Sequence, residues 1–267
     1  MKLTPGLRRF VTIWTIVVLV LLYIPLVFVV VNSFNVSKTF AFPPSGWTTT
    51  WWSAAAHSSG AWHALGTSVV VGLCATAIAL VLGTLAAFAV QRHDFFGKNV
   101  VNLLVVLPIT LPGIVTGIAL STTFTSVLGV MLGLGTVIVG HATFCIVVVY
   151  NNVQARLRRT GSSLEEASSD LGAHPWQTFR LVTFPMVRGA LLAGALLAFA
   201  LSFDEIVVTT FTAGPTVETL PVWIFANLFR PNQAPVVNVV AAVLTIVAIV
   251  PVWLAQRFGG DAATSRT

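Results

Sequence analysis

The chain has 267 residues, of which 56% are apolar and only 8% are charged. A soluble domain usually carries about 25% charged residues, so this chain has too few to cover a globule of its size in water. The composition excludes an ordinary soluble domain, a disordered chain and a nucleic-acid binder built on a basic surface. Together with a mean hydropathy of +0.92, it predicts an all-α polytopic membrane protein.

Six apolar runs are long enough to cross a bilayer as helices, which takes about 20 residues. The first run begins after Arg8 and Arg9 but is about twice as long as a usual signal-peptide core, so we interpret it as an uncleaved span. The apolar stretch 121–135 is rich in Gly, Ser and Thr and is expected to form a short re-entrant or interfacial helix. We treat residues 1–267 as one transmembrane domain with spans at residues 10–31, 65–90, 100–120, 136–153, 189–211 and 236–256. The third span is interrupted by Pro108 and Pro112, which suggest kinks.

The basic residues predict the orientation of these spans. If both termini lie in the cytoplasm, only Lys38 and Arg230 fall in outer segments, and the other 12 of the 14 basic residues face the cytoplasm. This asymmetry follows the positive-inside rule, and it explains the high isoelectric point by topology and contact with anionic lipid rather than nucleic acid. The cytoplasmic residues are Lys2, Arg8, Arg9, Arg92, Lys98, Arg156, Arg158, Arg159, Arg180, Arg188, Arg257 and Arg266.

Small residues recur every four positions in two of the spans. Such stripes let membrane helices approach closely, so we expect both to pack inside the helix bundle. The stripes are Ala75, Ala79, Gly83 and Ala87 in the second span, and Ala190, Gly194, Ala198 and Ser202 in the fifth.

The longest polar segment on the predicted cytoplasmic side is 154–188. Within it, Ser162 or Ser163 precedes Glu165 and Glu166, as expected for a helix N-cap followed by acids in the first turn. Gly172 and then Pro175 should end this helix. Its apolar residues suit docking into a groove on a soluble partner, and the predicted apolar face consists of Leu164, Ala167, Leu171 and Trp176.

This segment resembles the EAA motif of binding-protein-dependent ABC importer permeases, the MetI-like family. The motif is Glu-Ala-Ala, three residues, Gly, nine residues and Ile-x-Leu-Pro, and here it reads Glu166-Ala167-Ser168, Gly172 and 182–185 ending in Pro185. The spacing agrees throughout, and the substitutions, such as Ser168 for Ala, are mild. An ordinary amphipathic loop helix is the alternative interpretation.

The resemblance covers nearly the whole chain and is strongest to the second permease of spermidine/putrescine importers. The residues that carry it are 202–208, 211–215, 141–144 and 220–224. The resemblance implies a type I importer fold, a homologous permease partner, a dimer of ATPase subunits and an extracytoplasmic binding protein. It also implies that the ATPase-coupling residues are Glu165, Glu166, Ala167, Ser168, Leu171, Gly172 and Pro185.

The chain contains no Gly-x-x-x-x-Gly-Lys-Ser/Thr loop, so it cannot cradle ATP phosphates in the usual way. ATP and Mg²⁺ would therefore be bound by the partner ATPase. No nucleophile–base pair is visible, and we expect no catalytic residue, no cofactor and no metal on this chain. His141 is expected to be a packed, hydrogen-bonded histidine.

Asp204 and Glu205 are the only acids inside a predicted span. A charged residue there costs at least about 2.5 kcal/mol on insertion scales, so intramembrane acids are functional candidates. A carboxylate at this place would attract a cationic substrate. The alternative interpretation is a carboxyl group that is hydrogen-bonded between helices or kept protonated by desolvation. The substrate-path candidates are Asp204, Glu205 and the neighbouring Phe203, where one of the two acids faces the path and the other packs against neighbouring helices. We add Trp47, which is otherwise an interfacial anchor.

We therefore expect a permease subunit of an ATP-driven importer in the bacterial inner membrane, transporting polyamines or a similar small cation. The alternatives are an importer permease for aminoethylphosphonate, an amino acid, a sugar or ferric iron, and an ion-coupled secondary transporter. The fold alone does not choose among these solutes.

Overall fold

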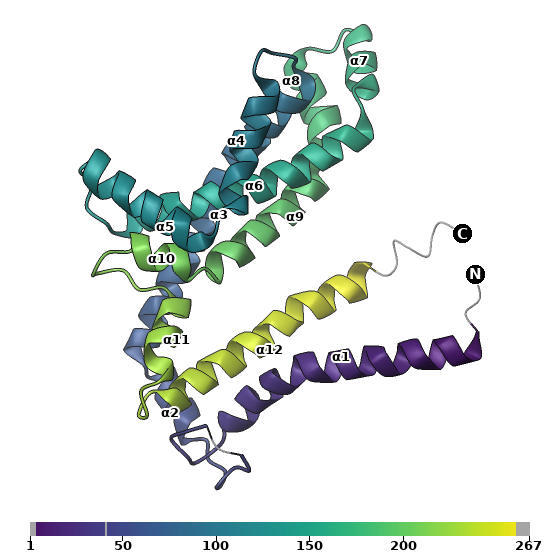
Figure 1. Cartoon of the computed structure of the whole chain (residues 1–267). Helices are drawn as coiled ribbons and strands as arrows, with labels where there is room; N and C mark the ends of the chain where they lie inside the picture. Colours follow the sequence, from purple (N-terminus) through teal and green to yellow (C-terminus); the bar gives the residue numbers. More distant parts are fainter. Residues whose placement is uncertain (1–3, 41, 260–267) are drawn as a thin grey trace. The chain divides into compact units, whose positions relative to one another are not determined.

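The computed structural model describes residues 4–40 and 42–259, which form helices joined by short loops (Figure 1). Two compact units are present, one of residues 62–223 and one that combines residues 1–61 with 224–267. The α-helices are α1 (Pro5–Asn32), α2 (Thr50–Ala56), α3 (Ser59–Arg92), α4 (Lys98–Thr110), α5 (Gly113–Thr122), α6 (Leu134–Thr160), α7 (Ser163–Asp170), α8 (Pro175–Thr178), α9 (Phe184–Phe203), α10 (Val207–Thr212), α11 (Leu220–Leu228) and α12 (Ala234–Gly259). Two π-helical turns, η1 (Thr123–Val127) and η2 (Phe179–Thr183), follow α5 and α8.

In the unit formed by the two ends of the chain, α12 contacts both α1 and α2. Most of α1 is exposed around its whole circumference, and Asn32 is its buried residue. Because its side chains are almost all apolar, such a helix suits lipid and not water. The loop after α1 is held by Asn35, whose backbone forms an antiparallel bridge to Trp47 and whose carbonyl oxygen accepts the Trp51 indole N–H at 2.9 Å.

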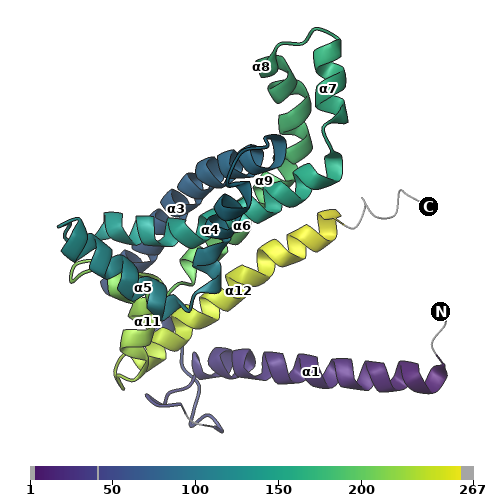
Figure 2. The same ribbon diagram turned by 45° about the horizontal axis from the view of Figure 1, so that its top comes forward.

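Helix α6 is the centre of the other unit. Figures 1 and 2 show it beside α9 with α3 alongside, and both predicted small-residue stripes pack in this core. A methyl group added at Gly83 of α3 would lie 2.8 Å from the carbonyl oxygen of Ile146, and one at Gly194 of α9 would lie 3.3 Å from the Cα atom of Val149. The stripes therefore bring both helices close to the backbone of α6, as helix association in lipid requires.

The third predicted span is not one continuous helix. Helices α4 and α5 are long and apolar enough to cross a membrane only when they are taken together. The chain bends by 107° at the break between them. Leu111 is extended there, which the following Pro112 favours because its ring disfavours helical geometry in the residue before it. The stretch 121–135 is likewise not a separate helix in its first part, since α5 and η1 run from Gly113 to Val127.

The fifth predicted span is also interrupted. The helical run Pro175–Phe203 is long and apolar enough to cross a membrane, but α9 ends at Phe203 and α10 starts only at Val207. The predicted span 189–211 is therefore not one continuous helix, because the chain leaves the helix at Asp204. The break between α9 and α10 contains Asp204 and Glu205, the two acids that the sequence places inside a span.

Among the described residues, four helical runs satisfy the criteria for a span, and the bent pair makes a fifth. The first, second and fourth predicted spans lie within α1, α3 and α6. The sixth, 236–256, lies within α12, which is apolar over 234–247, whereas the side chains of 248–259 lie outside the described part. The predicted C-terminal tail with Arg266 is also outside the described residues.

Candidate functional site

The polar segment 154–188 contains a short, well-delimited helix, α7. Gly161 and Gly172 flank it with φ angles of +62° and +83°, a backbone region that side chains rarely adopt. The backbone N–H groups of Glu165 and Glu166 donate to the Ser162 carbonyl oxygen at 2.9 Å each. Ser162 is the N-cap residue as predicted, but its hydroxyl donates to the Glu166 carboxylate instead of a backbone N–H group.

One flank of α7 is attached to neighbouring helices of the same unit. The Glu165 carboxylate forms an ion pair with Arg92, at the end of α3, with Nε and Oε2 2.9 Å apart. It also accepts a hydrogen bond of 2.9 Å from the Thr183 hydroxyl, in the last residue of η2. Ser168 and Thr178 join their hydroxyl groups at 3.0 Å, linking α7 to α8.

The predicted apolar face of α7 is open to its surroundings. Leu171 is 89% exposed, Leu164 is 55% exposed, and Ala167 and Glu166 are exposed as well. Trp176, at the start of α8, is exposed and stacks on Phe179 with ring centroids 5.6 Å apart. In Figures 1 and 2, α7 and α8 form one end of this unit, beyond the α6–α9 pair. Exposed leucines on a fixed short helix form a surface suited to a protein partner.

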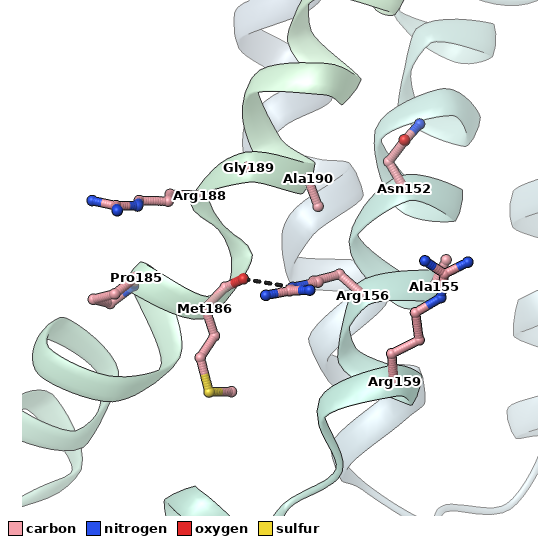
Figure 3. A pocket seen from close by; sticks show the side chains of 9 residues that line it. All are labelled: Asn152, Ala155, Arg156, Arg159, Pro185, Met186, Arg188, Gly189 and Ala190. Carbon is pink, nitrogen blue, oxygen red and sulfur yellow. Dashed lines mark hydrogen bonds between the residues drawn. The ribbon is translucent and has the colours of Figure 1, made fainter. Parts of the chain in front are cut away.

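A cavity of about 630 Å³ lies between the adjacent ends of α6 and α9 (Figure 3). The Nε–H group of Arg156 donates to the Met186 carbonyl oxygen at 2.8 Å. In Figure 3 the Arg188 side chain points away from this carbonyl oxygen. Three arginines and no carboxylate line the cavity, so it repels a cation. Its lining is Asn152, Ala155, Arg156, Arg159, Pro185, Met186, Arg188, Gly189 and Ala190.

The two acids at the end of α9 have different surroundings. An Oε1 atom of Glu205 accepts the backbone N–H of Val208 at 2.9 Å, so this side chain caps α10. Asp204 is exposed at the end of α9, and its carboxylate has no hydrogen bond or ion pair with any described residue. Glu205 is thus tied to the backbone, while the Asp204 carboxylate is available to a ligand.

His141 of α6 holds the two sides of this break together. Its Nδ1 atom lies 2.8 Å from the Ser202 hydroxyl of α9, and its Nε2 atom lies 2.8 Å from the Thr209 hydroxyl of α10. All three side chains are buried. The prediction of a packed, hydrogen-bonded histidine is confirmed, but nothing in the sequence indicated that its two partners flank Asp204 and Glu205.

The remaining predicted path residues have ordinary contacts. Phe203 contacts Phe199 in a tilted arrangement, with ring centroids 5.8 Å apart. Trp47 belongs to the other compact unit, where its side chain is 69% exposed and its backbone pairs with Asn35. Arg92 was missed as a site residue, because 73 positions separate it from Glu165 and only the folded chain brings them together.

Known proteins resemble this chain over most of its length. Residues 79–259 match the family described as binding-protein-dependent transport system inner membrane component. The putrescine transport system permease protein PotI of Escherichia coli K12 is 35% identical, with 86% of this chain and 85% of PotI covered. The spermidine/putrescine transport system permease protein PotC of the same organism is 32% identical, with 92% of each chain covered.

A solved bacterial ABC transporter involved in the import of the polysaccharide alginate has the same fold, with a TM-score of 0.69 at 14% identity. It covers 98% of this chain, and this chain covers 99% of it. The matched family region includes the bundle of α6 and α9, the attached helix α7 and the interrupted fifth helix. The chain therefore belongs to the binding-protein-dependent transport system inner membrane components, and it is a permease subunit of an ABC importer, not an enzyme.

Proposed function

We propose that this permease imports polyamines such as putrescine and spermidine. The observation that carries the proposal is the exposed Asp204 carboxylate, unpaired among the described residues, at the break of an otherwise apolar helix. A charged carboxylate inside a membrane segment is energetically unfavourable unless a positive charge compensates it. A cationic substrate can supply that positive charge. Protonated amines meet that requirement, and the names of both related permeases add support.

In this proposal the two acids divide the work. Asp204 attracts the ammonium group of the passing substrate, and Glu205 keeps the break in shape by capping α10. Phe203 contributes an aromatic face, which attracts cations through the ring quadrupole. The arginine-lined cavity between α6 and α9 has no part in binding the cation.

The partner ATPase docks on α7. Glu166, Ala167 and Leu171 form the contact, while Gly172 and Pro185 shape the ends of the segment that carries it. The ATPase dimer binds ATP and Mg²⁺, and its closure moves α7 and with it the helices of the permease. A homologous permease completes the path, and an extracytoplasmic binding protein delivers the substrate. Transport then proceeds by alternating access between two arrangements of the helices.

The protein crosses the bacterial inner membrane six times, with both termini in the cytoplasm. The 12-to-2 distribution of basic residues supports this topology. The ion pair between Arg92 and Glu165 supports it independently, because it places the end of α3 and the segment after α6 on the same side. Reporter fusions at residues 92–98 and 155–188 should report the cytoplasm, and an outside signal at either would refute the topology.

Substrate identity is tested on the cognate extracytoplasmic binding protein, because that subunit presents the solute to the permease. Calorimetric titration with putrescine, spermidine, aminoethylphosphonate, amino acids, sugars and ferric iron should give tight binding for the polyamines alone. Uptake of radiolabelled putrescine into proteoliposomes holding the whole importer should require ATP. Tight binding of another solute would assign the importer to that solute, and uptake driven by an ion gradient without the ATPase would indicate a secondary transporter.

The docking surface is tested with Glu166→Lys, which reverses an exposed charge on α7. This variant should lose the ATPase subunit on purification or hydrolyse ATP without transport. Asp94→Lys makes the same charge change at another exposed acid, between α3 and α4, and should behave as the wild type. Normal assembly and transport in Glu166→Lys would refute the assigned contact.

A further inference from the structure

The ion pair between Arg92 and Glu165 connects four parts of the chain. The Nε atom of Arg92 lies 2.9 Å from Oε2 of Glu165, and the Nη2 group of Arg92 donates to Oε1 at 3.3 Å. The same Nη2 group donates to the Gly161 carbonyl oxygen at 2.7 Å, in the turn that follows α6. The Thr183 hydroxyl, directly before α9, donates to Oε1 at 2.9 Å. The pair thus connects α7 with the ends of α3 and α6 and with the start of α9.

This contact is shielded from water, unlike the other ion pair nearby. The side chains of Arg92 and Glu165 are only 15% and 18% exposed. Lys98 and Asp94 form an ion pair of the same 2.9 Å length, but they are 32% and 99% exposed and lie four residues apart. Exposed pairs contribute little to stability, whereas a shielded Arg–carboxylate pair with a second hydrogen-bond donor fixes geometry. Among the described residues, Arg92 has Glu165 as its one acidic partner.

Neighbouring acids on α7 therefore face different surroundings. Glu166 is exposed, and among the described residues its carboxylate is bonded by Ser162 within the same turn, whereas the Glu165 carboxylate is held by Arg92 of α3 and Thr183 of η2. Glycines lie at both ends of α7, and their flexible backbone couples the movement of α7 only weakly to the adjoining chain. A displacement of α7 is therefore transmitted to other helices through the side-chain contacts of Glu165.

We propose that Glu165 is a positioning residue that fastens α7 to α3 and α9, so that displacement of α7 moves these two helices together. Arg92 is its essential partner, and Thr183 sets the direction of the carboxylate. This inference rests on the proposed docking of the ATPase on α7. It adds that docking of the ATPase is not sufficient for transport. The Arg92–Glu165 pair is also needed, because it converts closure of the ATPase into movement of α3 and α9.

The experiment uses the intact importer, purified with its partner subunits and reconstituted into proteoliposomes. The variants are Glu165→Gln, Arg92→Gln and the double variant, and the readout is the amount of substrate transported per ATP hydrolysed. Glu165→Gln keeps an oxygen that can accept from Thr183 but loses the charge. We expect each single variant to lower this ratio about tenfold, the change that corresponds to about 1.4 kcal/mol in a rate.

The double variant shows whether Arg92 and Glu165 act through their shared contact. The double variant should be no worse than either single variant, because each change already breaks the same contact. Asp94→Gln and Lys98→Gln, in the exposed ion pair, are the matched controls and should leave the ratio unchanged. A normal ratio in Glu165→Gln, or losses in the two single variants that multiply in the double variant, would overturn the proposal.

A crosslink separates this outcome from failure of the docking proposal. Leu171→Cys, in a background with Cys74→Ser, places a thiol on the exposed side of α7, while Cys145 stays buried. Crosslinking to the ATPase in both the Glu165→Gln and the parent background, together with a lowered transport ratio, supports the fastening role. Absence of the crosslink in the parent protein would refute docking on α7, and the fastening role with it.

Discussion

The two acids at the break of the fifth helix should respond differently to removal of their charge. The comparison is between Asp204→Asn and Glu205→Gln, two changes of the same kind at adjacent positions. The Asp204 carboxylate is exposed and bonded to no described residue, so its replacement breaks no contact of the folded chain. Glu205→Gln keeps the Oε1 atom that accepts the Val208 N–H at 2.9 Å, so α10 stays capped.

Coulomb's law sets the size of the effect. Unit charges 4 Å apart attract by about 1 kcal/mol in bulk water and by about 4 kcal/mol at an effective dielectric constant of 20. Since about 1.4 kcal/mol corresponds to a factor of ten, loss of the Asp204 charge should lower kcat/KM for putrescine uptake by at least about fivefold and at most about a thousandfold. Exposure of Asp204 to solvent favours the lower end. Glu205→Gln should change kcat/KM by less than about twofold, since the cap is retained.

The assay is ATP-dependent uptake of radiolabelled putrescine into proteoliposomes over a range of concentrations delivered on the binding protein. Thermal unfolding of the same preparations controls for folding, and Glu205→Ala, which removes the cap, should lose about 1 kcal/mol of stability. Wild-type uptake by Asp204→Asn would refute the assigned role. Equal losses in Asp204→Asn and Glu205→Gln would show that the two carboxylates do not divide the work as we propose.

Three further variants test the packing and the docking surface. Gly83→Ala should destabilise the protein by about 1–3 kcal/mol, since its methyl group would lie 2.8 Å from the Ile146 carbonyl oxygen, whereas Gly66→Ala on the same helix has no atom within 4 Å and should not; thermal unfolding compares them. His141→Leu should lower stability by about 1–3 kcal/mol because two buried hydroxyls lose a partner, and an unchanged melting temperature would contradict the described network. Leu171→Asp, at a residue 89% exposed, should change stability by less than about 0.5 kcal/mol yet reduce co-purification of the ATPase, and Leu171→Met should retain it.

Local signals predicted the extended helices and the limits of α7 well. Long apolar runs located α1, α3 and α6, because a helix in lipid satisfies its backbone hydrogen bonds within itself. Gly172 after α7 and the acids after Ser162 are equally local, so the sequence predicted where this helix begins and ends. The four-residue stripes identified the faces that pack on α6, since close approach needs small side chains.

The interruption of the third span at its prolines was predicted, but the 107° bend was not, because a proline inside a span also occurs in a merely kinked helix. The break in the fifth span was not predicted, because an apolar run has no feature that marks where a helix ends. There, Asp204 and Glu205 were noticed as charges and not as the end of α9. His141 stabilises that break from another helix, through partners 61 and 68 positions away, and no local pattern carries such information.

The sequence by itself determined that the chain is a membrane protein, which ends of its spans carry the basic residues, and which segment carries the family motif. These properties follow from composition and short spacings, which act through solvation and local backbone geometry. Tertiary structure alone decided that Glu165 turns inward to Arg92 while Glu166 stays exposed, and that Glu205 caps α10 while the Asp204 carboxylate is exposed. In the first pair the difference comes from a partner 73 positions away, and in the second it comes from the end of α9 at Phe203, which leaves Glu205 near the start of α10.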